Sequence, residues 1–124
     1  MLNFMMNRGA SASNAARMSP ADAVARAANN EIHVIDVRDH NEVAMSGKAE
    51  GALHIPLSVL RFQADPKGPD FHPELTTDKP VAVYCASGAR SQMAAQVLSS
   101  MGYEEVHNIG GLGHWHQAGG KISR

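Results

Sequence analysis

The only cysteine of this 124-residue chain, Cys85, opens a run of residues whose types and spacing could do chemistry. The run lies between an apolar stretch and an amphipathic one, and it reads Cys85-Ala86-Ser87-Gly88-Ala89-Arg90-Ser91. Small side chains allow the backbone to curl around the sulfur with its N–H groups inward, and Gly88 can take the positive φ that such a curl needs. Because N–H groups and a helix start lower the pKa of a thiol from its usual value near ~8.5, we expect Cys85 to be acidic and nucleophilic.

Arg90 adds a planar cation near the end of this Cys85–Ser91 loop. Its guanidinium could grip a sulfonate, a phosphate or a carboxylate with two parallel hydrogen bonds. It could equally brace the loop through a salt bridge to an acid such as Asp36 or Asp39, and the two roles are compatible. Ser91 is expected to cap the helix that follows, which is a structural role.

The cysteine count and the overall composition limit the kinds of protein to consider. One cysteine excludes an intramolecular disulfide and a two-cysteine redox cycle within the monomer, so another molecule must resolve any oxidised or sulfur-loaded Cys85. The formal net charge of −1, with 44% apolar and 19% charged residues, gives no sign of a nucleic-acid or membrane partner. No apolar run approaches the ~20 residues of a membrane span. We expect a cytoplasmic protein.

The seven histidines do not form a metal-binding motif. His114 and His116 flank Trp115, and residues two apart do not face one another on a helix. No cysteine or acid cluster completes a tetrahedral ligand set beside them. We therefore expect surface histidines around a core tryptophan, with no metal ion and no cofactor.

Helix-like and strand-like segments alternate along the chain after residue 18. Caps, breakers and hydrophobic runs predict helices at residues 19–29, 39–45, 57–63, 92–101 and 112–118, and strands at residues 32–37, 51–56, 81–84 and 105–109. This alternation predicts an α/β fold around a mainly parallel sheet. Function gathers at the carboxyl ends of the strands in such sheets, which is where Cys85 stands.

Residues 1–18 differ in character from the remainder, because they contain two arginines and no acid. No continuous apolar segment follows the basic start, which argues against a secretory signal. We expect a flexible leader or terminal extension at residues 1–18, followed by a single domain at residues 19–124. A transit peptide would have a similar composition.

Five blocks in this order resemble the single-domain rhodanese family of thiosulfate sulfurtransferases. They are Ile35–Arg38, Gly51–Leu57, Val83–Ser91, Gly102–Tyr103, and Gly110–Leu112 followed by Trp115 and Ala118–Gly119. Each block is short, but the five occur in order at ordinary spacings, and the resemblance extends over about residues 19–122. The resemblance implies a three-layer rhodanese-like fold, with a mainly parallel central sheet of about five strands and helices on both of its faces.

The resemblance also implies a sulfurtransferase that works through a Cys85 persulfide. The thiolate would take the outer sulfur of thiosulfate or a similar donor, and the substrate and persulfide would be held by Ala86, Ser87, Gly88, Ala89, Arg90 and Ser91. A thiophilic acceptor, which could be cyanide, a thiol or a protein cysteine, would then remove the sulfur. Asp36 and Arg38 correspond to the family's buried acid and its partner, which support the site.

One departure and two alternatives accompany this resemblance. The family often has a histidine before the Gly-Ala block, where this chain has Lys48. Related phosphatases have a histidine before the cysteine and one more residue before the arginine, whereas this chain has Tyr84 before the cysteine and four residues between Cys85 and Arg90. The smaller loop favours a sulfane sulfur over a phosphatase or arsenate reductase reaction. The other alternative is a sulfur-relay or regulatory binding module with little activity on cyanide.

Overall fold

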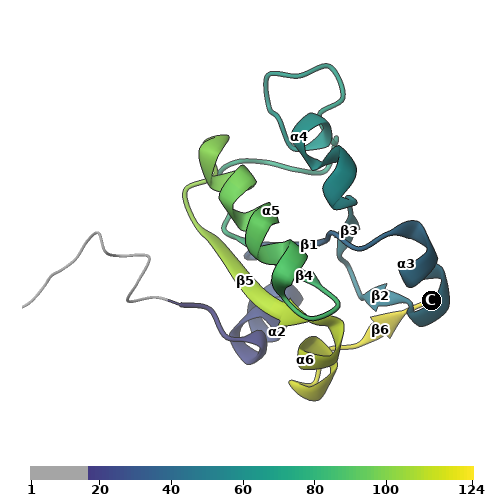
Figure 1. The fold of residues 1–124 in the computed structure, drawn as a ribbon. Helices are drawn as coiled ribbons and strands as arrows, with labels where there is room; N and C mark the ends of the chain where they lie inside the picture. The colour runs from purple at the N-terminus through teal and green to yellow at the C-terminus, as the bar shows by residue number, and fades with distance from the viewer. Residues whose placement is uncertain (1–16) are drawn as a thin grey trace, which may run out of the picture.

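The computed structural model of the protein describes residues 17–124 (Figure 1). Its helices are α2 (Pro20–Ala28), α3 (His40–Ser46), α4 (Leu60–Gln63), α5 (Ala89–Ser100) and α6 (Leu112–Gln117), with a short 3₁₀ helix, η1 (Leu57–Val59), directly before α4. Its strands are β1 (His33–Asp36), β2 (Lys48–Ala49), β3 (Leu53–His54), β4 (Val81–Cys85), β5 (Val106–Gly111) and β6 (Ile122–Ser123). The predicted helices and strands are present, and the short strands β2 and β6 are additional to the prediction.

The central sheet contains four parallel strands in the order β3-β1-β4-β5. The prediction of a parallel sheet is confirmed, but its size is corrected from about five strands to four in the described residues. The remaining two strands, β2 and β6, pair antiparallel in a separate ribbon. Gly47 makes this ribbon possible, since its φ is 75° and a Cβ there would lie 2.6 Å from the carbonyl oxygen of Ser123.

Both faces of the central sheet are buried, which gives the three layers that the resemblance implies. Ile35, Val83 and Cys85 point to one face and pack in a cluster with residues of α4 and α5. The alternate positions on the same strands, among them Ala82 and Tyr84, pack with residues of α2 and α6. Figure 1 shows α5 crossing the sheet over β4 and β5. Cys85 is therefore the last residue of a strand that is buried on both sides.

The helix after Cys85 begins earlier than the sequence predicts. Gly88 is its N-cap, with a φ of 109°, and α5 starts at Ala89 rather than at Gln92. The prediction that Gly88 takes a positive φ is confirmed. The interpretation of Ser91 as the helix cap is wrong, because Ser91 lies inside the first turn of α5 and is fully buried.

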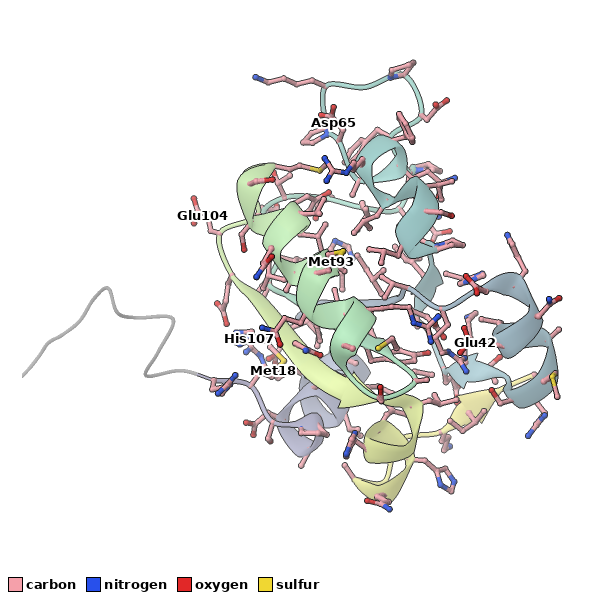
Figure 2. All side chains as sticks on the ribbon, in the orientation of Figure 1. Met18, Glu42, Asp65, Met93, Glu104 and His107 are labelled. Carbon is pink, nitrogen blue, oxygen red and sulfur yellow. The ribbon has the colours of Figure 1, made fainter. Side chains whose placement is uncertain are left out.

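The packed part of the chain also begins earlier than predicted. Met18, which the sequence assigned to a leader, is buried and its backbone N–H donates to Nδ1 of His107 over 3.2 Å. Figure 2 shows Met18 beside His107. Ser19 then caps α2, where its hydroxyl accepts from the N–H of Asp22 at 3.0 Å. Residues 1–16 lie outside the described residues, so their interpretation as a leader stays a prediction.

Candidate active site

The sulfur of Cys85 lies at the floor of the Cys85–Ser91 loop. Cys85 ends β4, at the carboxyl edge of the parallel sheet, and only 1% of the residue is exposed. On the neighbouring strand β5 it is in register with Gly111. The small residues Ala86, Ser87 and Ala89 are exposed around it. A reactant must therefore reach the sulfur through the loop.

Hydrogen-bond donors of the loop surround the thiol. The N–H of Gly88 lies 3.0 Å from Sγ of Cys85, and the hydroxyl of Ser91 lies 3.4 Å from it. Burial raises the pKa of the Cys85 thiol, but hydrogen bonds from the Ser91 hydroxyl and from the N–H groups of Ser91, Gly88 and Ser87 outweigh it and lower the pKa to about 7. A large share of Cys85 is consequently thiolate at neutral pH.

Asn108 joins the loop to β5, and sequence reasoning did not identify it as a site residue. Its Nδ2 donates to the carbonyl of Gly88 at 2.9 Å, while its Oδ1 accepts from the N–H of Gly110 at 3.0 Å. The same Oδ1 lies 2.7 Å from the hydroxyl of Ser91. Asn108 thus fixes both the residue that caps α5 and the hydroxyl beside the sulfur.

The glycine pair after Asn108 allows the loop to lie directly on β5. A Cβ at Gly111 would stand 2.1 Å from the carbonyl oxygen of Ala86, and one at Gly88 would stand 3.5 Å from Cα of Gly110. A side chain at Gly111 would displace the loop, whereas the distance from Gly88 to Gly110 is an ordinary van der Waals contact. Gly111 therefore contributes to the site through its small size.

Arg90 is held by an acid that the sequence analysis did not name. Its Nη1 and Nη2 donate to the two carboxylate oxygens of Glu42 at 2.7 and 2.8 Å. The partners suggested from sequence, Asp36 and Asp39, are wrong: Asp36 is bonded to Arg38 instead, and Asp39 is the N-cap of α3. Figure 2 shows Glu42 on the side of α3 that faces the body of the molecule.

Asp36 and Arg38 form a second, fully buried cluster beneath the site. Nη2 of Arg38 lies 2.8 Å from Oδ2 of Asp36, and the two side chains are 4% and 0% exposed. The hydroxyl of Tyr84 donates to the same oxygen at 2.6 Å and accepts from the N–H of Ala49 at 2.8 Å. Since Tyr84 precedes Cys85, this cluster ties the end of β4 to β1 and β2.

Two further sequence interpretations can be compared with the structure. Trp115 is buried and His114 and His116 are exposed, which confirms surface histidines around a core tryptophan. Among residues 17–124, no three histidine, cysteine, aspartate or glutamate side chains are grouped as metal ligands. Lys48, at the position of the family's histidine, donates from Nζ to the carbonyl of Ala52 at 2.8 Å.

Comparisons with known proteins agree with this arrangement of fold and loop. The rhodanese-like domain model matches residues 19–118. A Bacillus subtilis protein, uncharacterized protein YqhL, is 41% identical over 98 residues, which are 78% of this chain and 68% of that protein. Thiosulfate sulfurtransferase GlpE of Vibrio cholerae is 33% identical over 90 residues, which are 71% of this chain and 76% of that protein.

A solved structure from Rhodopseudomonas palustris superimposes with a TM-score of 0.76 and 32% identity, over 99% of this chain and 100% of that one. It is described as a protein of unknown function and possible tyrosine phosphatase. Fold and loop define a class of parallel α/β domain with a cradled thiol at the end of a central strand. With the family match, it follows that this chain belongs to the rhodanese-like domain family.

No helix within residues 17–124 has both the length and the apolar character needed to cross a membrane.

Proposed function

We propose that the protein is a sulfurtransferase that carries a sulfane sulfur on Cys85. The observation that carries the proposal is the contact of Sγ with the Gly88 N–H and the Ser91 hydroxyl, at 3.0 and 3.4 Å, at the end of a central strand. These donors stabilise a thiolate, which is the attacking form of a thiol. The family, whose relatives include proteins named thiosulfate sulfurtransferase, supports the same reaction.

The first half-reaction loads the sulfur. The Cys85 thiolate attacks the outer sulfur of thiosulfate; a new S–S bond forms, the S–S bond of thiosulfate breaks, and its electron pair leaves with sulfite. The total charge is unchanged, because one thiolate and one dianion become one persulfide anion and one sulfite dianion. No general base is required, since a large share of Cys85 is already thiolate at neutral pH.

The second half-reaction transfers the sulfur from Cys85 to an acceptor. A nucleophile such as cyanide, a thiolate or a protein cysteine attacks the outer sulfur of the persulfide and restores the Cys85 thiolate. The loop N–H groups from Ala86 to Ser91 hold the anionic persulfide in the meantime. Because the chain has one cysteine, the acceptor must be a separate molecule.

Asp36, Arg38 and Arg90 support the site by holding its elements in place. Asp36 and Arg38 neutralise each other within the core and hold the end of β1 beside β4 through Tyr84. Arg90 is joined to α3 by its ion pair with Glu42, and this pair braces the far end of the loop.

Turnover measurements separate this proposal from its alternatives. With thiosulfate and cyanide, the wild-type protein should form thiocyanate, and Cys85→Ser should form none. Hydrolysis of an aryl phosphate or reduction of arsenate, without reaction with thiosulfate, would contradict the proposal and favour the phosphatase class suggested for the Rhodopseudomonas palustris structure. Sulfur transfer to a protein thiol with little thiocyanate formation would favour a sulfur relay.

A further inference from the structure

Glu42 occupies the fork of the one arginine in the Cys85–Ser91 loop. The two terminal nitrogens of Arg90, Nη1 and Nη2, donate to the two carboxylate oxygens of Glu42, at 2.7 and 2.8 Å. This is the geometry in which arginine would otherwise hold the oxyanion end of a ligand. The fork that could bind an anionic donor is therefore already filled by a side chain of the protein.

A second contact keeps the carboxylate in place. Oε1 of Glu42 also accepts from the N–H of Asp39 at 3.0 Å, in the first turn of α3. The hydrogen bond from Arg90, followed by that from the Asp39 backbone, holds the pKa of Glu42 at about 2. Glu42 therefore carries its charge at every pH at which the thiol reacts, and the Asp39 N–H gives its carboxylate a second hydrogen bond besides those from Arg90.

Arg90 and Cys85 belong to the same loop. The pKa of Arg90 is raised, first by its hydrogen bond to Glu42 and also by the negative charges of Glu42 and Cys85. Glu42 is therefore paired with the cation of the loop that holds the thiol. The nearby cation Arg38 is paired with Asp36, so its charge is likewise compensated.

We infer that Glu42 determines donor specificity: by neutralising Arg90 it makes the site favour sulfane donors with a single negative charge over dianionic thiosulfate. This inference rests on the proposed sulfurtransferase function. Donors of this kind are organic thiosulfonates and persulfides. When the Cys85 thiolate attacks an alkyl thiosulfonate anion, the S–S bond of the donor breaks, the Cys85 persulfide anion forms and a sulfinate anion leaves. The total charge is unchanged, because two monoanions react and two monoanions are formed.

The expected preference follows from the charge of the side chains that a donor approaches. A dianion that approaches the loop must either displace the carboxylate of Glu42 from Arg90 or bind beside it, and both cost free energy. A monoanion with an apolar substituent loses less binding free energy than the dianion, because its repulsion from Glu42 is about half as large at the same distance. Exposed ion pairs are modest in strength, so we expect discrimination of about three- to tenfold.

Alkylation of Cys85 tests the charge effect without any sulfur chemistry. Iodoacetate and iodoacetamide differ by one negative charge, and their rate constants should be compared at low salt and at a pH where the thiol is fully ionised. Glu42→Gln should raise the ratio of iodoacetate to iodoacetamide rates about three- to tenfold. The rise should be smaller when Arg90 is replaced as well, in Glu42→Gln with Arg90→Gln, because no guanidinium is then released.

A matched control removes the same charge elsewhere. Glu31, which pairs with Arg26 on the α2 side of the sheet, offers this control as Glu31→Gln and should leave the ratio unchanged. An unchanged ratio in folded Glu42→Gln would overturn the inference. If that variant does not fold, the wild-type protein can be used instead, by measuring its rate of alkylation by iodoacetate as salt is added. A rate that falls steeply with salt would show that a cation near Cys85 is uncompensated, and would contradict the inference.

The donors themselves provide the second readout. The wild-type protein should show a higher kcat/KM with methanethiosulfonate than with thiosulfate, and Glu42→Gln should reduce this preference through a lower KM for thiosulfate. A preference that Glu42→Gln does not move would overturn the inference. Absence of turnover with both donors, together with the expected alkylation ratios, would instead reject the sulfurtransferase function and leave the charge effect established.

Discussion

The hydroxyl of Ser91 lies 3.4 Å from the sulfur of Cys85, although the two residues belong to different elements, a helix and a strand. The same oxygen lies 2.7 Å from Oδ1 of Asn108. A hydroxyl has one proton to donate. When Cys85 is a thiol, the proton can go to Asn108; when Cys85 is a thiolate, the charge-assisted bond to sulfur is the stronger one. The pair therefore favours ionisation of the thiol.

The pH dependence of the reaction should report this thiolate. Because the pKa of Cys85 is lowered to about 7, the alkylation rate should rise as the pH increases toward 7 and level off above about 8. The direction follows from the thiolate being the reactive form. Rates of iodoacetamide alkylation from pH 5 to 10 provide the measurement. A midpoint near ~8.5, the value of an ordinary thiol, would contradict the assignment of these donors.

Replacement of the hydroxyl should shift that curve. Ser91→Ala removes a donor to the thiolate, so the pKa of Cys85 should rise to about 8. At pH 7 the alkylation rate should fall about fivefold, while at pH 9.5 it should match the wild-type rate. Ser99, an exposed serine on the same helix, serves as the control, and Ser99→Ala should leave the curve unchanged. A lower plateau at high pH without a shifted midpoint would indicate a general loss of structure instead.

The loop and its cysteine could be predicted from the sequence, because they are contiguous. Cys85, the positive φ of Gly88 and the strand–loop–helix order depend on neighbours in the chain, and local patterns reveal them. Ser91 was assigned wrongly because a serine near a helix start usually caps it. Here Gly88 already fills that role, which turns Ser91 inward.

The partners of the loop could not be predicted, because they are distant in sequence. Glu42 and Arg90 are 48 positions apart, and Ser91 and Asn108 are 17 positions apart. No periodicity or motif links such pairs; the register of β4 with β5 and the position of α3 bring them together. The sequence predicts an acidic partner for Arg90, but the partner is Glu42, three residues after Asp39 and six after Asp36.

Gly111→Ala tests the close packing of the loop on β5. A Cβ at this position would stand 2.1 Å from the carbonyl oxygen of Ala86, so the loop must move. We expect destabilisation by about 1–3 kcal/mol and a slower reaction of Cys85, measured by urea unfolding and alkylation. Gly113, which has no atom within 4 Å of its Cβ position, gives the control. Because Gly113 lies in α6, Gly113→Ala should be neutral or stabilise by up to about 1 kcal/mol.

Tyr84→Phe tests the buried cluster beneath the site. The change removes a donor to Asp36 and the acceptor of the Ala49 N–H, both buried, so unfolding should require about 1–3 kcal/mol less free energy. Tyr103→Phe is the control, since the hydroxyl of Tyr103 makes a single hydrogen bond, to the carbonyl of Ala64. Urea unfolding of both variants provides the comparison. A smaller loss for Tyr84→Phe than for Tyr103→Phe would contradict a supporting role for the Asp36 cluster.

Transfer of a sulfur atom through Cys85 should be visible in the intact mass of the protein. After incubation with thiosulfate or methanethiosulfonate and removal of the donor, the protein should gain about 32 Da, the mass of one sulfur atom. Cyanide should return the mass to its starting value, and Cys85→Ser should gain nothing. An unchanged mass for the folded wild-type protein with both donors, or a gain that persists in Cys85→Ser, would contradict the account.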